Sequence, residues 1–283
     1  MDDFAAWIGR ESRASDQLGE ALAARWLATF DLARPDPRLM PQGIHFCLCT
    51  PEVPGALLGE DGHPRRDDSP QSFLPPVPLP RRMWAGSTIH FLAPIAVGGV
   101  IERVSRVAAI REKEGSSGRL AFVDVEHTTL ANGTAAVRET QTLVYREAAA
   151  PDAPLSPPPP GEGRFAPDGW DAHRCLVPDA RLLFRYSALT FNTHRIHYDA
   201  PYAQGVERYR GLVVHGPLTA SLLLQLAARV VGDNRLRSFA FRGLSPAIVG
   251  EVLHLVMRRG EKGYELAAFA EDGRQITAAS AAL

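Results

Sequence analysis

The sequence predicts an α+β fold of two similar halves, in which antiparallel strands wrap around a buried helix. Alternating apolar and polar runs, separated by Asn-Gly or Asp-Gly turns, recur in both halves and are typical of antiparallel hairpins. The segment 217–231 has a helical pattern and is apolar on nearly every face, so we expect it to be buried. A sheet around such a helix is the hotdog arrangement. We therefore predict a double hotdog, with two antiparallel sheets each wrapped around a central helix.

The two halves share a repeated pattern. Pro94 and Gly98 recur as Pro246 and Gly250, each 152 residues further along the chain. In both halves two alternating runs, a turn and a last alternating run follow, which indicates an internal duplication. The predicted strands are 100–110, 119–130 and 134–146 in the first half, and 251–259, 263–270 and 274–282 in the second.

A Pro-rich segment divides the chain. Residues 148–170 include four consecutive prolines at 157–160. Proline donates no backbone hydrogen bond and favours an extended polyproline conformation, so we expect a linker here. The sequence thus predicts an N-terminal domain over 1–147, a linker over 148–170 and a C-terminal domain over 171–283.

The sequence predicts a central helix clearly in the second half but not in the first. Residues 17–29 have a helical pattern, with Ser15 or Asp16 as a candidate cap. Pro217 suits the first turn of the second helix. The stretch 31–85 is rich in proline, and no central helix of the first half can be placed in it.

Composition excludes several classes of partner. The formal net charge is −1, which argues against nucleic acid binding and a polybasic membrane anchor. No run of about 18 apolar residues predicts a membrane span, and Met1–Phe4 lack the layout of a secretory signal. Cys47 and Cys49 are too close for an ordinary disulfide, and with Cys175 the cysteines number three. We interpret them as reduced thiols and expect a cytoplasmic protein.

The residues most suited to chemistry cluster in the second half. His194, His197 and His215 fall within 22 residues. If 194–203 forms a helical turn, His194 and His197 share a face, with Asn192 near its start. Gly216 opens the buried helix, so its amide is an unpaired donor at the positive end of the helix dipole. The pattern predicts a site for an oxyanion beside a histidine that moves a proton.

Other interpretations of these residues stay open. The histidines could be structural, or His194 and His197 could bind a metal with Asp199 as a third ligand, although we predict no metal site. Ser187 and Ser221 lack the Gly-x-Ser-x-Gly setting of a nucleophile. Glycine-rich phosphate loops are absent from the sequence.

The stretches 191–199 and 209–218 resemble the hydratase 2, or MaoC-like, superfamily. Within it they resemble the mitochondrial-type hydroxyacyl-thioester dehydratases, a branch that includes mesaconyl-C4-CoA and itaconyl-CoA hydratases. The superfamily motif Gly-Asp-x-Asn-Pro-Leu-His-x-Asp places its catalytic His on His197 and its catalytic Asp on Asn192. Asn192 cannot act as an acid or base, but it can orient a water molecule. The resemblance gives Gly216 the oxyanion role and His194 a supporting role.

The resemblance implies reversible hydration of a 2-enoyl-CoA to a 3-hydroxyacyl-CoA, including short dicarboxylic substrates such as mesaconyl-C4-CoA or itaconyl-CoA. No cofactor is implied, because the CoA thioester is itself the substrate. The stretch 73–86 also resembles the branch, so we expect the first domain to complete the acyl pocket and CoA groove. A hotdog thioesterase, a non-catalytic acyl-CoA-binding module and a homodimer stay open. Candidate substrate-binding residues are Arg185 and Arg195 for a free carboxylate, Arg81 and Arg82 for CoA phosphates, and His215.

Overall fold

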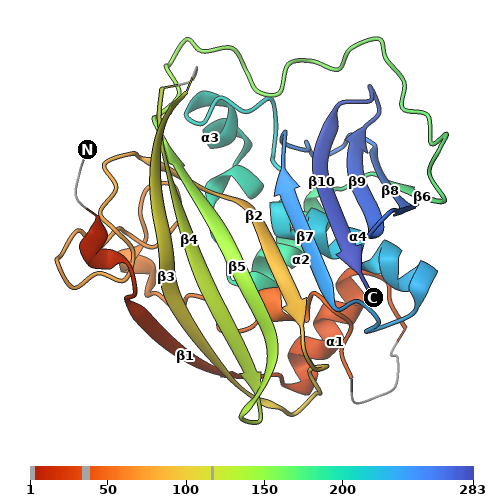
Figure 1. Cartoon of the computed structure of the whole chain (residues 1–283). Helices are drawn as coiled ribbons and strands as arrows, with labels where there is room; N and C mark the ends of the chain where they lie inside the picture. Colours follow the sequence, from red (N-terminus) through yellow and green to blue (C-terminus); the bar gives the residue numbers. More distant parts are fainter. Residues whose placement is uncertain (1–3, 34–38, 116–117) are drawn as a thin grey trace.

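The computed structural model describes residues 4–33, 39–115 and 118–283, and its main element is one antiparallel sheet of ten strands (Figure 1). The strand order is β1-β3-β4-β5-β2-β7-β10-β9-β8-β6. The first half supplies β1 (Glu11–Gln17), β2 (Arg81–Phe91), β3 (Val100–Gly115), β4 (Gly118–Ala131) and β5 (Thr134–Arg146). The second half supplies β6 (Ala172–Leu176), β7 (Ser238–Gly243), β8 (Leu253–Gly260), β9 (Gly263–Ala270) and β10 (Gln275–Ala282).

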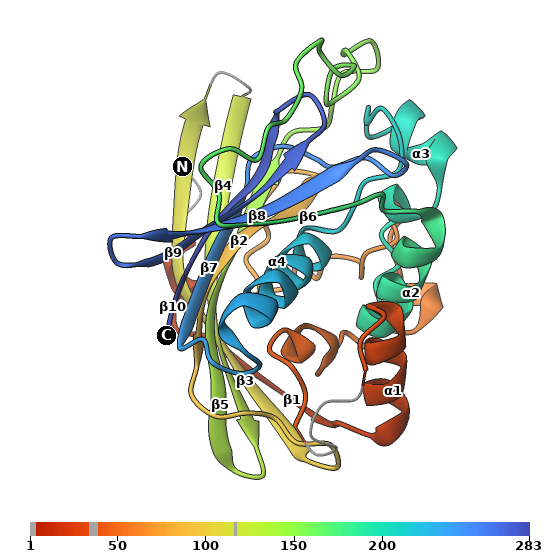
Figure 2. The same ribbon diagram turned by 90° about the vertical axis from the view of Figure 1, so that its right-hand side faces the viewer.

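The helices lie on one face of this sheet. Figure 2 shows α4 (Gly216–Val231) along that face, with α1 (Glu20–Thr29) and α2 (Ala180–Thr190) further from the strands. The buried side of α4 carries leucines packed against the strands, because its sequence is apolar almost throughout. The shorter elements are α3 (Ala200–Gly205), η1 (Ala5–Trp7), η2 (Ile44–Cys47), η3 (Gly55–Leu57) and η4 (Arg195–His197).

The two halves join edge to edge where β2 pairs with β7. Gly86 is required at this joint, since a Cβ atom there would lie 2.3 Å from the carbonyl oxygen of Phe241. A single hydrophobic cluster includes Ile89 of the first half together with Leu223 and Phe239 of the second. The halves therefore share a core across the joint.

The α+β class is confirmed, and the predicted strands lie close to the observed ones. Both hairpin turns follow the prediction, with Asn132 and Gly133 at positive φ in the first half and Gly273 at positive φ in the second. In the first half the short 3₁₀ helix η2 packs into the shared core, with Ile44 and Phe46 buried. This element has four residues, against the sixteen of α4.

Some local expectations differ from the structure. Helix α1 begins after Gly19, which makes no side-chain cap, so the expected caps Ser15 and Asp16 are wrong. Asp16 instead lies near the end of β1, where its carboxylate accepts hydrogen bonds from the backbone N–H groups of Gln17 and Cys49, both at 2.7 Å. The backbone between residues 148 and 170 forms no helix or strand, while the predicted domain boundaries stay a prediction.

Two expectations concern the ends and surroundings of the chain. Of Met1–Phe4, residues 1–3 lie outside the described residues. Among the described helices, none combines the length and apolar character needed to cross a membrane.

Candidate active site

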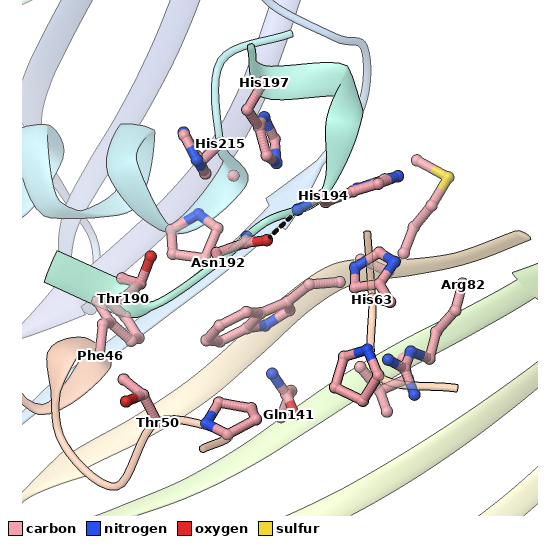
Figure 3. Close-up of a pocket in the computed structure, with 18 of the residues that line it drawn as sticks. Phe46, Thr50, His63, Arg82, Gln141, Thr190, Asn192, His194, His197 and His215 are labelled. Carbon is pink, nitrogen blue, oxygen red and sulfur yellow. Dashed lines mark hydrogen bonds between the residues drawn. The ribbon is translucent and has the colours of Figure 1, made fainter. Parts of the chain in front are cut away.

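A cavity of about 1380 Å³ is lined by residues of both halves. The second half contributes Asn192, His194, His197, His215 and Gly216, so the structure brings these five of the predicted site residues into one space. Figure 3 shows the side chains of Asn192, His194, His197 and His215 in this cavity, with His63, Arg82 and Gln141 of the first half. The first-half residues at the cavity include His63, Arg82, Arg103, His127, Glu139 and Gln141.

His197 lies at the end of η4 with its imidazole buried. Its Nδ1 is 2.7 Å from the backbone carbonyl oxygen of Val213, and a carbonyl oxygen can only accept, so Nδ1 carries the proton. Burial lowers the pKa of His197 to about 4 despite that hydrogen bond. The ring is therefore neutral at pH 7, with a lone pair on Nε2 that can accept a proton.

The His215 ring stacks on the His197 ring, with centroids 3.5 Å apart and planes 18° from parallel. His215 Nε2 lies 2.9 Å from the hydroxyl of Ser187, while Nδ1 is buried and has no hydrogen-bond partner among the described residues. Burial lowers the pKa of His215 well below its usual value. Two neutral rings can stack this closely, because neither carries a charge that repels the other.

Gly216 is the first residue of α4 and directly follows His215, the N-cap. Its amide has no acceptor among the hydrogen bonds of the described residues. The amide therefore offers a free donor at the positive end of a sixteen-residue helix, beside the stacked imidazoles. Such a donor suits an oxygen that becomes negatively charged during a reaction.

Asn192 follows Phe191, the C-cap of α2, whose backbone is in the left-handed conformation. The Asn192 side-chain oxygen accepts a 2.9 Å hydrogen bond from the backbone N–H of His194, drawn in Figure 3. This leaves the NH₂ group of the amide free to donate. Asn192 precedes η4 but does not cap it, because the N-cap is His194. Burial lowers the pKa of His194 to about 2, so this third ring is also neutral.

Sequence reasoning missed His63, which comes from the first half and faces His194. The two ring centroids are 4.1 Å apart. Asp61 accepts a 3.0 Å hydrogen bond from His63 Nδ1. No periodic pattern marks His63, because it lies in the irregular Pro-rich stretch, and only the fold brings it to the site.

Asp61, His63 and His194 place their ligand atoms within 4.8 Å of one another, close enough to consider a metal ion. Their geometry favours a hydrogen-bonded group instead. The Asp61 carboxylate already bonds the His63 ring nitrogen, and the planes of His63 and His194 are inclined by only 37°.

The structure differs from the expectation for three arginines, none of which lines the cavity. Arg185 projects from α2 and donates to the carbonyl oxygen of Ala28. Arg195 forms an ion pair with Asp199 at 2.8 Å, and Arg81 forms one with Glu207. These three guanidinium groups are held by partners outside the cavity. The sequence did not reveal this, because position along the chain does not indicate where a side chain points.

Arg82 does line the cavity. It has no ion pair or side-chain hydrogen bond among the described residues, so its guanidinium is free to meet an anion. Figure 3 places it near His63. The expectation that Arg82 contacts an anionic part of the substrate is therefore compatible with its position.

The first-half end of the cavity is polar, which sequence reasoning also missed. Glu139 accepts a 2.6 Å hydrogen bond from Ser87, and burial raises the pKa of Glu139. Arg103 donates to the backbone carbonyl oxygen of His45 at 2.7 Å. The sequence does hold a signal for this polar end. Arg103 and Ser105 alternate on β3, as Glu139 and Gln141 do on β5, and a spacing of two residues places each pair on one face of the sheet.

Comparison with known proteins identifies relatives over most of the chain. A family model described as hydroxyacyl-thioester dehydratase type 2 matches residues 43–249. The chain is 40% identical over 285 residues to the mesaconyl-C(4)-CoA hydratase of Chloroflexus aurantiacus, covering 99% of this chain and 98% of that protein. It is 27% identical over 243 residues to the mitochondrial hydroxyacyl-thioester dehydratase type 2 of Schizosaccharomyces pombe, covering 75% of this chain and 76% of the relative.

A solved structure from Mycobacterium tuberculosis, described as a double hotdog fold, superposes with a TM-score of 0.59. The identity is 15%, and the match covers 98% of this chain and 96% of the other. The predicted double hotdog fold is confirmed by this likeness, but the two predicted sheets are joined into one sheet of ten strands. Among the described residues of the first half, the short helix η2 packs into the core and no long buried helix like α4 is present.

Proposed function

The chain belongs to the hydroxyacyl-thioester dehydratase type 2 family, and on this premise we propose that it is a hydro-lyase that reversibly hydrates a 2-enoyl-CoA to a 3-hydroxyacyl-CoA. The membership confirms the resemblance seen in residues 191–199 and 209–218. One observation carries the proposal. The neutral His197 ring stacks on the ring of His215, the residue that precedes Gly216 and its free amide, and all three residues line a cavity shared by both halves.

The Gly216 amide binds the thioester carbonyl oxygen in this proposal. Addition of water at C3 pushes electrons from the double bond onto that oxygen, so the amide and the helix dipole act on charge that develops in the transition state. A single donor of this kind contributes about 3 kcal/mol in other enzymes.

His197 is the base that activates water. The Val213 carbonyl oxygen fixes the proton on Nδ1, which leaves Nε2 to take a proton from the attacking water. Asn192 holds the water through its NH₂ group, since its oxygen is engaged by the His194 backbone. His194 supports the arrangement by fixing Asn192.

The substrate is a short acyl-CoA with a second carboxylate, such as a mesaconyl-C4 or itaconyl thioester. Support comes from the hydratase of Chloroflexus aurantiacus, which is 40% identical and named for mesaconyl-C(4)-CoA. The free guanidinium of Arg82 and the polar first-half end of the cavity suit an acyl group that is not purely apolar. The partner that we propose for this site is therefore an acyl-CoA.

Location and assembly are further proposals. Cys47, Cys49 and Cys175 are all free thiols, which fits a reducing cytoplasm. The chain carries two hotdog halves, and two such chains could pair as a homodimer.

A substrate panel tests the proposed function. Purified protein is mixed with mesaconyl-C4-CoA, itaconyl-CoA, crotonyl-CoA and a longer enoyl-CoA, and two signals are followed: loss of the conjugated double bond and release of free CoA. We expect loss of the double bond without free thiol for at least one dicarboxylic substrate. Release of CoA would instead indicate a thioesterase, and binding without either signal would indicate a non-catalytic module.

A further inference from the structure

Residues 59–63 of the first half are held firmly against the segment that carries Asn192 and His194. A Cβ atom on Gly62 would lie 1.9 Å from the backbone oxygen of Thr193, so only glycine permits this approach. Thr193 donates its hydroxyl to the Gly62 carbonyl at 2.6 Å, and the Arg195 N–H donates to the Asp61 carbonyl at 2.9 Å. The position of the next residue, His63, is therefore determined by direct bonds to the site.

Asp61 fixes the orientation of His63. One carboxylate oxygen accepts from the His63 backbone N–H and the other from ring Nδ1, both at 3.0 Å. Burial would raise the pKa of Asp61, but the hydrogen bonds and charge of His63 outweigh it and lower that pKa to about 2. An ionised carboxylate only accepts, so Nδ1 carries a proton and Nε2 is the ring atom left for a substrate. The His63 side chain is 23% exposed and lines the cavity.

Hydration of a double bond needs two proton transfers. One proton leaves the attacking water, and another reaches C2 of the acyl group. His197 can accept the first, but Asn192 has no proton to exchange. His194 and His215 are buried and held neutral. Asn192 and the neutral imidazoles of the second half thus offer no acid for C2 separate from His197.

We propose that His63 is a further catalytic residue, which exchanges the proton at C2 through Nε2, and that Asp61 is the positioning residue that holds it. The proposal rests on the hydratase function above. The nearby carboxylate balances the charge of His63 whenever both ring nitrogens are protonated. The first half thereby supplies an acid that the asparagine at 192 cannot provide.

In the direction of hydration, the step begins with His63 protonated at both ring nitrogens beside the ionised Asp61 carboxylate, and His63 becomes neutral when it gives up its Nε2 proton. The water oxygen bonds to C3 while its proton passes to Nε2 of His197, and the π electrons move onto the thioester oxygen at Gly216. The enolate pair then forms the C2–H bond with the proton from Nε2 of His63. The proton on His197 returns to His63 through solvent, which restores both rings.

The first test replaces His63 by Asn, whose NH₂ group can still donate to Asp61 but cannot transfer a proton at the Nε2 position. Hydration of mesaconyl-C4-CoA is measured, and His90→Asn on the exposed end of β2 is the matched control. We expect His63→Asn to lower kcat by about a hundredfold, the usual scale of general acid–base catalysis, with KM changed less than about threefold. The control should keep its kcat. A loss of less than about tenfold in His63→Asn would overturn the proposal.

A second test follows the C2 proton itself. The 3-hydroxyacyl-CoA is incubated with enzyme in D₂O, and deuterium at C2 is measured by NMR. His63→Asn should slow this exchange in proportion to its kcat. If exchange continued at the wild-type rate, His63 would not handle that proton and the proposal would fail.

A double-mutant cycle tests the role of Asp61. Asp61→Asn should lower kcat by about tenfold or more, and Asp61→Asn with His63→Asn should be no slower than His63→Asn alone, because residues that act as a unit are not additive. Additive losses would show that Asp61 acts independently of His63. Should His63→Asn fail to fold, Asp61→Asn decides alone: wild-type kcat would overturn the proposal.

Two further results separate the possible failures. Wild-type protein that hydrates no enoyl-CoA would defeat the proposed function before any variant is considered. Wild-type activity that a chelator removes and Zn²⁺ restores would make Asp61, His63 and His194 a metal site and overturn the role of His63 as a free proton carrier.

Discussion

Single residues decide which part of the substrate the cavity can bind, and Arg82 is the clearest case. Arg82→Gln should raise KM for mesaconyl-C4-CoA by about tenfold or more, because a bound anion loses a charge-assisted hydrogen bond of about 1.5–3 kcal/mol. If Arg82 contacts the acyl carboxylate, crotonyl-CoA should keep its KM. If Arg82 contacts a CoA phosphate, KM should rise for both substrates. Arg242→Gln, exposed on β7, is the matched control, and unchanged KM for both substrates would contradict any contact with Arg82.

The residues of the site were only partly predictable from the sequence. Asn192, His194 and His197 lie within one short segment, and Gly216 begins an obviously buried helix, so local spacing sufficed. His63 is far away along the chain and reaches His194 only through the docking of Gly62 on Thr193. Without a periodic pattern, a single histidine in an irregular stretch carries no sequence signal.

Among the elements, the segment 59–63 matters because it joins the first half to the site. Gly62→Ala should lower kcat and reduce the free energy of unfolding, since the added Cβ would collide with the Thr193 carbonyl. Gly98→Ala is a matched control: Gly98 has φ 88°, against 87° for Gly62, but nothing lies within 4 Å of its Cβ position. Both variants carry backbone strain of about 1–3 kcal/mol, so only the Gly62 variant should also lose activity. Equal activity in the two variants would contradict the importance of this contact.

Elements with regular periodicity were well predicted, whereas irregular ones were not. Alternation predicted β5 and β9 closely, and continuous apolar sequence predicted α4. The 3₁₀ helix η2 is too short for a periodic pattern, and its burial depends on strands far along the chain. His45 and Phe46 of η2 line the cavity, so the element that the sequence did not reveal is also part of the site.

At the scale of the whole molecule, the burial of neutral histidines makes stability depend on pH. The pKa values of His45, His127 and His197 are lowered to about 3, 4 and 4, mainly by burial. Below the ordinary histidine value of about 6.5, the unfolded chain binds protons that the folded chain does not. Stability is therefore complete above that pH and falls as the pH drops toward 4, by up to about 1.4 kcal/mol per pH unit for each ring.

Unfolding by denaturant at pH 7.5, 6 and 5 checks this expectation. The free energy of unfolding should decrease steadily below about pH 6.5. His45→Gln should reduce the slope with pH even if it lowers stability at pH 7.5, because one protonation is removed. A free energy of unfolding that stayed constant from pH 7.5 to 5 would contradict the neutral, buried state of these rings.

The most direct measurement is the kcat of His197→Asn for hydration of mesaconyl-C4-CoA. The Asn NH₂ group can still donate to the Val213 carbonyl oxygen, so the variant should stay folded while losing the base at Nε2. We predict a fall in kcat of about a thousandfold, within the range of general acid–base catalysis, at an unchanged unfolding midpoint. A folded variant that hydrates the substrate within about tenfold of the wild-type rate would contradict it.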